Sequence, residues 1–135
     1  MLFEAVRPAP SVSNAQSWNL ILVDDTEIKD RVARATFSKT FSLNQFAAEA
    51  PAIAVLTLEK HSLLTRVVGW MKRRPFYRMD IGIAAAQFCL HATEPELGTR
   101  MLGSLDEAEF KKTLKIPWPY AWPWRLLLRI RRRIA

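Results

Sequence analysis

The sequence predicts one small domain that contains both β-strands and α-helices, and three observations lead to this. Two apolar runs, at residues 19–23 and 52–58, have the length of strands, and the second is apolar enough to be buried on both faces of a sheet. Residues 79–93 carry apolar side chains at helical spacing. Residues 106–117 read as an amphipathic helix with acids in its first turn and lysines in its last. A length of 135 residues suits a single domain.

Composition narrows the class of protein. Half of the residues are apolar, which is enough for a folded core. The single cysteine, Cys89, excludes an internal disulfide framework and favours a reducing compartment, so we expect a cytoplasmic protein. We find neither a secretory leader nor an apolar run that would span a bilayer. The net charge is +7. Five arginines and no acid lie in residues 118–135, so most of the net positive charge belongs to that segment and little of it to the rest of the chain.

The first elements are separated by strong turn and stop signals. Residues 2–7 have the pattern of a helix end that Pro8 stops. Asp25 or Thr26 is placed to cap the next helix. The apolar side of that helix is expected to consist of Ile28, Val32, Ala33 and Ala35. Residues 44–50 are expected to be helical, up to Pro51.

The predicted helix at residues 79–93 is apolar over most of its circumference. One stripe consists of Ile81, Ala84, Ala85, Phe88 and Ala92, and Ile83, Ala86 and Leu90 widen it. Such a width predicts a helix that is buried on most sides. His91, near its end, is expected to face water or to cap carbonyls, and we do not expect it to be catalytic.

The loop at residues 9–18 is the main candidate for a binding site. It is rich in short polar side chains and runs directly into the first predicted strand, which would fix it in place. The Ser11 hydroxyl, the Asn14 and Gln16 amides and free backbone N–H groups are its potential donors. On the pattern alone, a simple turn with local hydrogen bonds is the favoured interpretation of these residues.

A second polar segment, residues 60–78, combines six cations with Trp70, Phe76 and Tyr77. Cations interleaved with aromatic residues can bind nucleic acid through phosphate contacts and stacking. No nucleic-acid-binding motif accompanies them, so we favour a solvated loop or short helix and expect no specific nucleic-acid partner.

Two motifs resemble the nitroreductase family of flavoproteins. The first is Ala-Pro-Ser at residues 9–11, followed by Asn14, Gln16 and Trp18; Ser17 stands where the family usually has proline. The second runs from Glu94 to Gly103 and is similar to the family pattern Glu-Leu-Gly-Leu-Gly-Thr-Cys, an apolar pair and Gly. Glu94, Leu97, Gly98, Thr99 and Gly103 agree with that pattern. Glu96 replaces a glycine that lets the helix end in a left-handed turn, so strain is expected there. Residues 80–85 and the Ile-Pro that ends the helix at 106–117 also resemble the family.

The resemblance implies an α+β fold, a mixed or antiparallel sheet flanked by helices, incomplete at both ends. It implies a homodimer that binds FMN between the subunits and uses NAD(P)H to reduce a nitroaromatic compound, a quinone or a similar acceptor. The residues that it places at the cofactor are Pro10, Ser11, Val12, Asn14, Gln16, Asn44, Met101, Leu102 and Gly103. Backbone amides at Leu102 and Gly103 are expected to face the flavin ring. A glycine is needed there because a residue without a Cβ atom lets the backbone approach a flat ring closely. We identify no catalytic side chain and no metal site, which suits chemistry carried by a flavin.

The resemblance divides the chain into a partial nitroreductase-like domain, residues 1–117, and a divergent segment, residues 118–135. Family members normally carry an Arg-x-Ser-x-Arg motif for the FMN phosphate before the first helix seen here, and further basic residues after the last. In this chain three tryptophans and two prolines fill residues 118–124, which is unlike a strand. Residues 125–133 form a short segment that is both basic and apolar, which leaves three interpretations: contact with an anionic membrane, nucleic-acid binding, or a tail without a role.

The alternative to an FMN-dependent oxidoreductase is a degenerate member of the family that no longer binds flavin.

Overall fold

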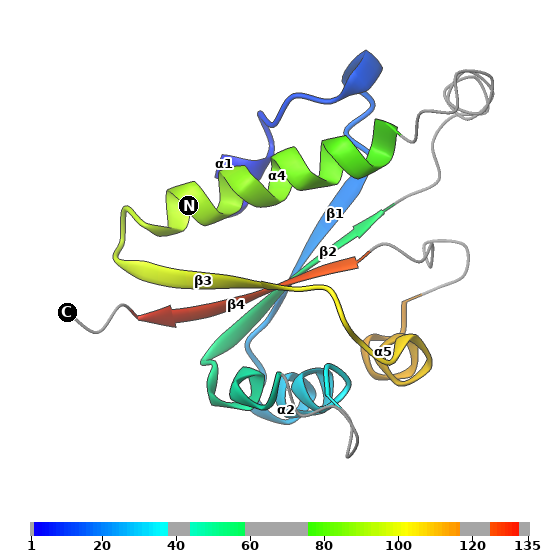
Figure 1. Cartoon of the computed structure of the whole chain (residues 1–135), viewed down its shortest axis with the longest axis vertical. Helices are drawn as coiled ribbons and strands as arrows, with labels where there is room; N and C mark the ends of the chain where they lie inside the picture. Colours follow the sequence, from blue (N-terminus) through cyan, green and yellow to red (C-terminus); the bar gives the residue numbers. More distant parts are fainter. Residues whose placement is uncertain (1, 38–43, 59–75, 117–124, 133–135) are drawn as a thin grey trace.

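The described part of the chain is built on a four-stranded antiparallel sheet. The computed structural model describes residues 2–37, 44–58, 76–116 and 125–132. The strands lie in the order β1-β2-β4-β3 (Figure 1), and every neighbouring pair is antiparallel. Their bounds are β1 Trp18–Val23, β2 Ala52–Leu58, β3 Leu97–Leu102 and β4 Arg125–Arg132. This arrangement confirms the predicted α+β class.

Helices cover both faces of the sheet (Figure 1). The long helix α4 (Phe76–Ala92) and the short α1 (Leu2–Val6) pack on one face. The other face carries α2 (Thr26–Arg34), the 3-10 helix η2 (Gln45–Glu49) and α5 (Glu107–Leu114). A further 3-10 turn, η1 (Val12–Asn14), lies in the loop before β1. Among the residues described, no helix has the length and apolar character needed to cross a membrane.

Strand β2 is the centre of the core, and the prediction that it is buried on both faces is confirmed. Its side chains alternate between two apolar clusters, because successive residues of a strand point to opposite faces. Leu56 and Ala54 join the cluster under α4, whereas Ile53 and Val55 join the cluster under α2 and α5. All four are 0% exposed. Strand β1 is instead an edge strand that is mostly half-buried, and its Leu22 is 38% exposed.

Carboxylates cap two helices: the cap predicted at Asp25 is confirmed, and Asp106, predicted as the first residue of a helix over 106–117, instead caps the shorter helix α5. The Asp25 carboxylate accepts a hydrogen bond from the backbone N–H of Ile28 at 2.9 Å and caps α2. Asp106 caps α5 by accepting from Ala108 and Glu109 at 3.0 and 3.1 Å. Carboxylates at these positions satisfy N–H groups that have no partner within the helix.

The expected apolar side of α2 is partly wrong. Val32, Ala33 and Ala35 are buried, but Ile28 is 39% exposed and Lys29 is only 8% exposed. The Lys29 ammonium donates to the backbone oxygen of Ala48 at 3.0 Å and pairs with Asp30 at 2.7 Å. Because its long stem lies along the core while its charged end finds partners, lysine takes a position that the pattern assigns to an apolar residue.

The prediction that α4 is buried on most sides is wrong for one of its two apolar faces. The stripe of Ile81, Ala84, Ala85, Phe88 and Ala92 is buried against the sheet, as predicted. The widening residues are not buried: Ile83 is 36% exposed, Leu90 is 69% exposed, and Ala86 is also exposed. His91 is exposed as expected, and its Nδ1 lies 3.1 Å from the Gln87 carbonyl oxygen.

The interpretation of residues 125–133 as a segment outside the sheet is wrong. Residues 125–132 form β4, which lies between β2 and β3 and pairs with both. The membrane and nucleic-acid interpretations required a separate tail, and they lose that basis here. Residues 60–75, for which a solvated loop was favoured over a nucleic-acid site, lie outside the described residues.

The strain predicted at Glu96 is present, because its φ of 58° lies in the left-handed region. We expect Glu96→Gly to stabilise the protein by about 1 kcal/mol, since glycine adopts this conformation without a steric penalty. Urea denaturation of both proteins measures the change. Glu94→Gly in the same turn is the control: Glu94 is not among the left-handed residues, so its replacement should stabilise nothing. An unchanged midpoint for Glu96→Gly would show that the turn is not strained.

Candidate functional site

The loop between α1 and β1 has an unusual backbone. Ser13, Asn14 and Gln16 have φ values of 57°, 51° and 42°, although none of them is glycine. Asparagine tolerates the left-handed region, but serine and glutamine adopt it at a cost of about 1–2 kcal/mol each. Such strain persists only where surrounding contacts enforce it, and it is concentrated at functional sites. The backbone therefore supports the choice of this loop as a binding element.

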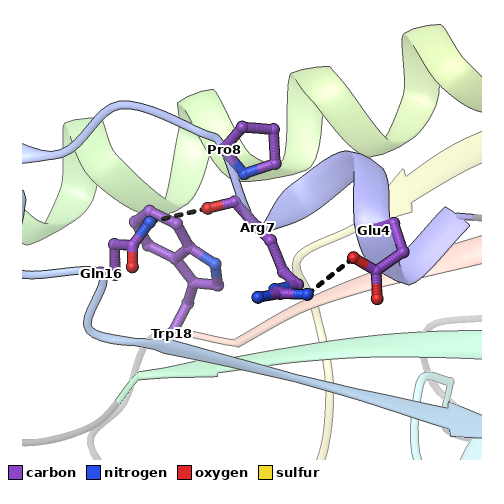
Figure 2. Close-up of a pocket in the computed structure, with 5 residues that line it drawn as sticks. All are labelled: Glu4, Arg7, Pro8, Gln16 and Trp18. Atoms are coloured by element: carbon purple, nitrogen blue, oxygen red, sulfur yellow. Dashed lines mark hydrogen bonds and ion pairs between the residues drawn. The ribbon is translucent and has the colours of Figure 1, made fainter.

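Hydrogen bonds from the loop's own residues hold this conformation. The Ser11 hydroxyl oxygen accepts from the backbone N–H of Gln16 at 2.9 Å. The Gln16 side-chain amide donates to the backbone oxygen of Arg7 at 2.7 Å, as Figure 2 shows. Two of the side chains predicted to present donors to a ligand therefore also hold the loop itself.

One contact ties the loop to the rest of the fold. The backbone N–H of Val12 donates to a carboxylate oxygen of Asp80 in α4 at 3.1 Å. Sequence reasoning did not single out Asp80 as a site residue. A signal was available, because an acid at position 80 shares the buried face of the helix with Ala84 and Phe88, where an apolar residue is expected.

Three of the predicted loop residues are open to solvent. Pro10, Asn14 and Gln16 are exposed, whereas Ser11 and Val12 are half-buried. Beside the loop lies a cavity of about 560 Å³, lined by Glu4, Arg7, Pro8, Gln16 and Trp18 (Figure 2). Arg7 and Glu4 pair across its wall at 2.8 Å. Asn14 is thus the predicted residue whose side chain the chain leaves most available.

The second group of predicted residues lies at the end of β3. Leu102 is 2% exposed and belongs to the core, whereas Met101 is 48% exposed. A Cβ atom built on Gly103 would meet no other atom within 4 Å, and Gly103 does not have a positive φ. Within the described part of the chain, the glycine is therefore required neither by packing nor by its backbone conformation. Its bare backbone faces open space that a flat ligand could occupy.

Asn44 is tied to the same region. Its side-chain amide donates to the backbone oxygen of Thr36 at 3.1 Å. The neighbouring carbonyl, that of Ala35, accepts from the backbone N–H of Asp106 at 2.6 Å. In addition, the Arg100 guanidinium of β3 lies 4.2 Å from the centroid of the Phe46 ring in η2. The end of α2 therefore connects Asn44 with the turn that follows Gly103.

This turn borders a second cavity of about 560 Å³. Arg31 and Arg34 line one side of it, and Ser104 and Leu105 line the other. Arg31 pairs with Glu109 at 3.6 Å. The cavity therefore offers cations and apolar surface beside the backbone of the turn.

The strand register relates the two groups of residues. Trp18, which follows the loop, lies opposite Leu58; Leu102 lies opposite Leu127, which itself lies opposite Val55. The start of β1 and the end of β3 therefore point to the same end of the sheet, although Leu102 is level with Ile21, three residues along β1 from Trp18. They are at opposite edges, however, and three strand spacings separate them, about 14 Å. Within one chain the described residues do not close around a common ligand.

Comparison with known proteins decides the family. The model of the nitroreductase family matches residues 1–128, which includes the first half of β4. The chain belongs to the nitroreductase family. Comparison with curated protein sequences gives no match.

Solved nitroreductase-family structures share its fold. A nitroreductase-like protein from Streptococcus mutans superposes with a TM-score of 0.78 at 17% identity, over 99% of this chain and 76% of that one. A family protein from Clostridium novyi gives 0.75 at 22% identity, over 96% and 69%. An FMN-dependent nitroreductase from Clostridium difficile gives 0.73 at 20% identity, over 98% and 72%. At these identities the likeness establishes the nitroreductase fold.

Proposed function

We propose that this nitroreductase-family protein is an FMN-dependent oxidoreductase that passes hydride from NAD(P)H to a nitroaromatic compound, a quinone or a similar acceptor. The observation that carries the proposal is that the backbone of Gly103, at the end of β3 in a nitroreductase fold, faces open space. A bound FMN would supply the hydride-transfer chemistry, so the protein would need no catalytic side chain of its own. The match of residues 1–128 to the family and the flavin dependence of the Clostridium difficile relative support the assignment.

The described residues fit a flavin ring in two groups. The N–H groups of Leu102 and Gly103 and the Asn44 side chain would hold the ring from one subunit. The exposed Asn14 and the half-buried Ser11 would approach from the other, because one chain keeps the two groups at opposite edges of its sheet. An amide N–H directed at the ring nitrogen that gains charge on reduction stabilises the reduced state.

The exposed face of α4 supports the proposed homodimer. Met79, Ile83, Ala86 and Leu90 follow one another at intervals of four, three and four residues, which places them on one stripe of the helix. All four are exposed in the single chain. At Gly82, on the same side, a Cβ atom would meet nothing within 4 Å, which leaves room for close approach of a second helix. A second copy of the chain is the proposed cover for this stripe.

Ile83→Glu should convert a dimer into monomers, because two buried carboxylates would face each other without partners. Light scattering coupled to gel filtration measures the molar mass. Ile28→Glu is the matched control: Ile28 and Ile83 are 39% and 36% exposed, but Ile28 lies on α2 on the other side of the sheet. If Ile83→Glu remains a dimer, α4 is not the interface.

The direct test of the function is flavin binding. The purified protein should be yellow or take up added FMN, with an absorbance band of bound oxidised flavin. Under anaerobic conditions it should oxidise one equivalent of NADH or NADPH per flavin, and it should turn over further only when a nitro compound or quinone is supplied. A folded, colourless dimer that binds no FMN would favour the degenerate relative instead. The half-buried thiol of Cys89 fits the cytoplasmic location that we propose with this function.

A further inference from the structure

Asp80 is the acid in the buried face of α4 that the fold itself does not require. Its side chain is 2% exposed, and one carboxylate oxygen accepts the N–H of Val12 at 3.1 Å. The other oxygen is buried and has no hydrogen-bond partner in the described part of the chain. Burying a carboxylate that is only partly satisfied is unfavourable, so this position would be more stable with an apolar residue. What the acid provides is its one long-range contact, to a residue 68 positions away in the sequence.

That contact reaches the loop at the point where its backbone is most constrained. Val12 is the first residue of η1, and Ser13 and Asn14 follow it in the left-handed region. The other hydrogen bonds of residues 11–16 are local to the segment that precedes β1. Gln16 bonds Ser11 and Arg7, and the backbone N–H groups of Asn14 and Ala15 donate to the carbonyl oxygens of Ser11 and Val12. Within the described residues, the Asp80 contact is the hydrogen bond that fixes η1 relative to α4.

The exposed stripe of α4 links the Val12–Asp80 hydrogen bond to the proposed second subunit. Met79 and Ile83, adjacent to Asp80 in the helix, belong to the exposed stripe proposed to meet a second subunit. A loop fixed to α4 is therefore also fixed relative to the partner subunit. If Asn14 reaches a flavin held by the partner's turn, its distance from that flavin depends on this bond.

We propose that Asp80 is a positioning residue that holds residues 11–16 in the conformation that receives FMN. The inference rests on the proposed function, because it assumes that the loop contacts the flavin. Asp80 touches no reacting atom; it acts through the N–H of Val12. Its stability penalty is the expected signature of a residue kept for a site rather than for the fold.

Two variants remove the bond from opposite ends. Asp80→Ala removes the acceptor. Val12→Pro removes the donor, and proline suits this position because Val12 opens a helical turn and Ser11 before it is already extended, with φ −143° and ψ 155°. We expect each variant to raise the Kd for FMN at least tenfold, measured by fluorescence titration well below the melting temperature. The double variant should bind no more weakly than the weaker single variant, because both remove the same bond.

Two further variants separate positioning from stability. Asp80→Asn keeps an acceptor oxygen for Val12 and should retain FMN affinity within about threefold of the wild type. Phe88→Leu, in the same buried face of α4 and 1% exposed, should lower the melting temperature but leave the Kd unchanged. In the flavin-free protein, amide hydrogen exchange of residues 11–16 should accelerate in Asp80→Ala and not in Phe88→Leu.

The outcomes distinguish this inference from the function on which it rests. A wild type that binds no FMN overturns both. A wild type that binds FMN, with Asp80→Ala and Val12→Pro binding it within twofold, overturns the positioning role alone. Equal loss of affinity in Phe88→Leu and Asp80→Ala would also overturn it, because general destabilisation would then explain the effect.

Discussion

A chain that stops at residue 124 is expected to be unfolded. Removal of residues 125–135 deletes β4, which pairs with β2 along one side and with β3 along the other. The sheet would divide into the antiparallel pair β1-β2 and an isolated β3, and two new strand edges would be left without partners. The apolar cluster under α4 would lose Ile130, which is 6% exposed. Because domains of this size are stable by only about 5–15 kcal/mol, such a loss exceeds what the rest of the chain can offset.

Circular dichroism and thermal melting test this expectation. The truncated chain should lose the cooperative transition of the full chain. The matched control ends at residue 132, which leaves β4 intact, and it should melt as the full chain does. A cooperative transition in the chain ending at residue 124 would mean that β4 is dispensable and that residues 125–135 form a separate tail after all.

The reason that β4 escaped prediction is physical. Its arginines and the preceding proline- and tryptophan-rich stretch are poor strand signals, and a strand's stability comes mainly from its neighbours in the sheet. Those neighbours, β2 and β3, are distant in sequence, so no local pattern reports the pairing. By contrast, β2 was predictable because an unbroken apolar run has few other uses.

Helix periodicity predicted which apolar residues of α4 share a face of the helix, but not what covers each face. The same stripe rule describes a face buried by the chain's own sheet and a face available to another copy. In α2 the same rule predicted that Ile28 is buried, whereas Lys29 is the buried residue. The rule takes no account of a long cationic side chain whose charged end finds hydrogen-bond partners.

For the candidate site, the sequence predicts a binding loop but not the hydrogen bonds that hold it. Polar residues before a strand indicate donors, yet the Ser11 hydroxyl and the Gln16 amide also hold the loop itself. Of the three left-handed residues, only asparagine is of a type that suggests this conformation in advance. The contact from Val12 to Asp80 depends on tertiary packing, and no pattern within either segment predicts it.

Replacement of Gly103 by leucine is expected to abolish flavin binding without unfolding the protein. Among the described residues, a Cβ atom at Gly103 has no neighbour within 4 Å, and the φ of Gly103 is not positive, so leucine meets neither a clash with them nor backbone strain. In the proposed holoenzyme, the same open space is occupied by the flavin ring, and a side chain of four carbons would exclude it. We expect the Kd for FMN to rise at least 100-fold, which corresponds to about 2.7 kcal/mol. The melting temperature of the flavin-free protein should change by no more than about 2 °C, since exposed substitutions rarely alter stability by more than 0.5 kcal/mol.

The pair of measurements distinguishes a binding role for Gly103 from a role in folding. Ala108→Leu places the same side chain at an exposed position five residues away on α5, and it should leave both FMN affinity and melting temperature unchanged. If Gly103→Leu binds FMN as tightly as the wild type, the ring does not lie against this backbone and the proposed site is wrong. If Gly103→Leu unfolds instead, the space at Gly103 is closed by residues outside the described ranges, and the glycine serves packing rather than the flavin. Loss of flavin with an unchanged melting temperature is the result that only a ligand against the bare backbone explains.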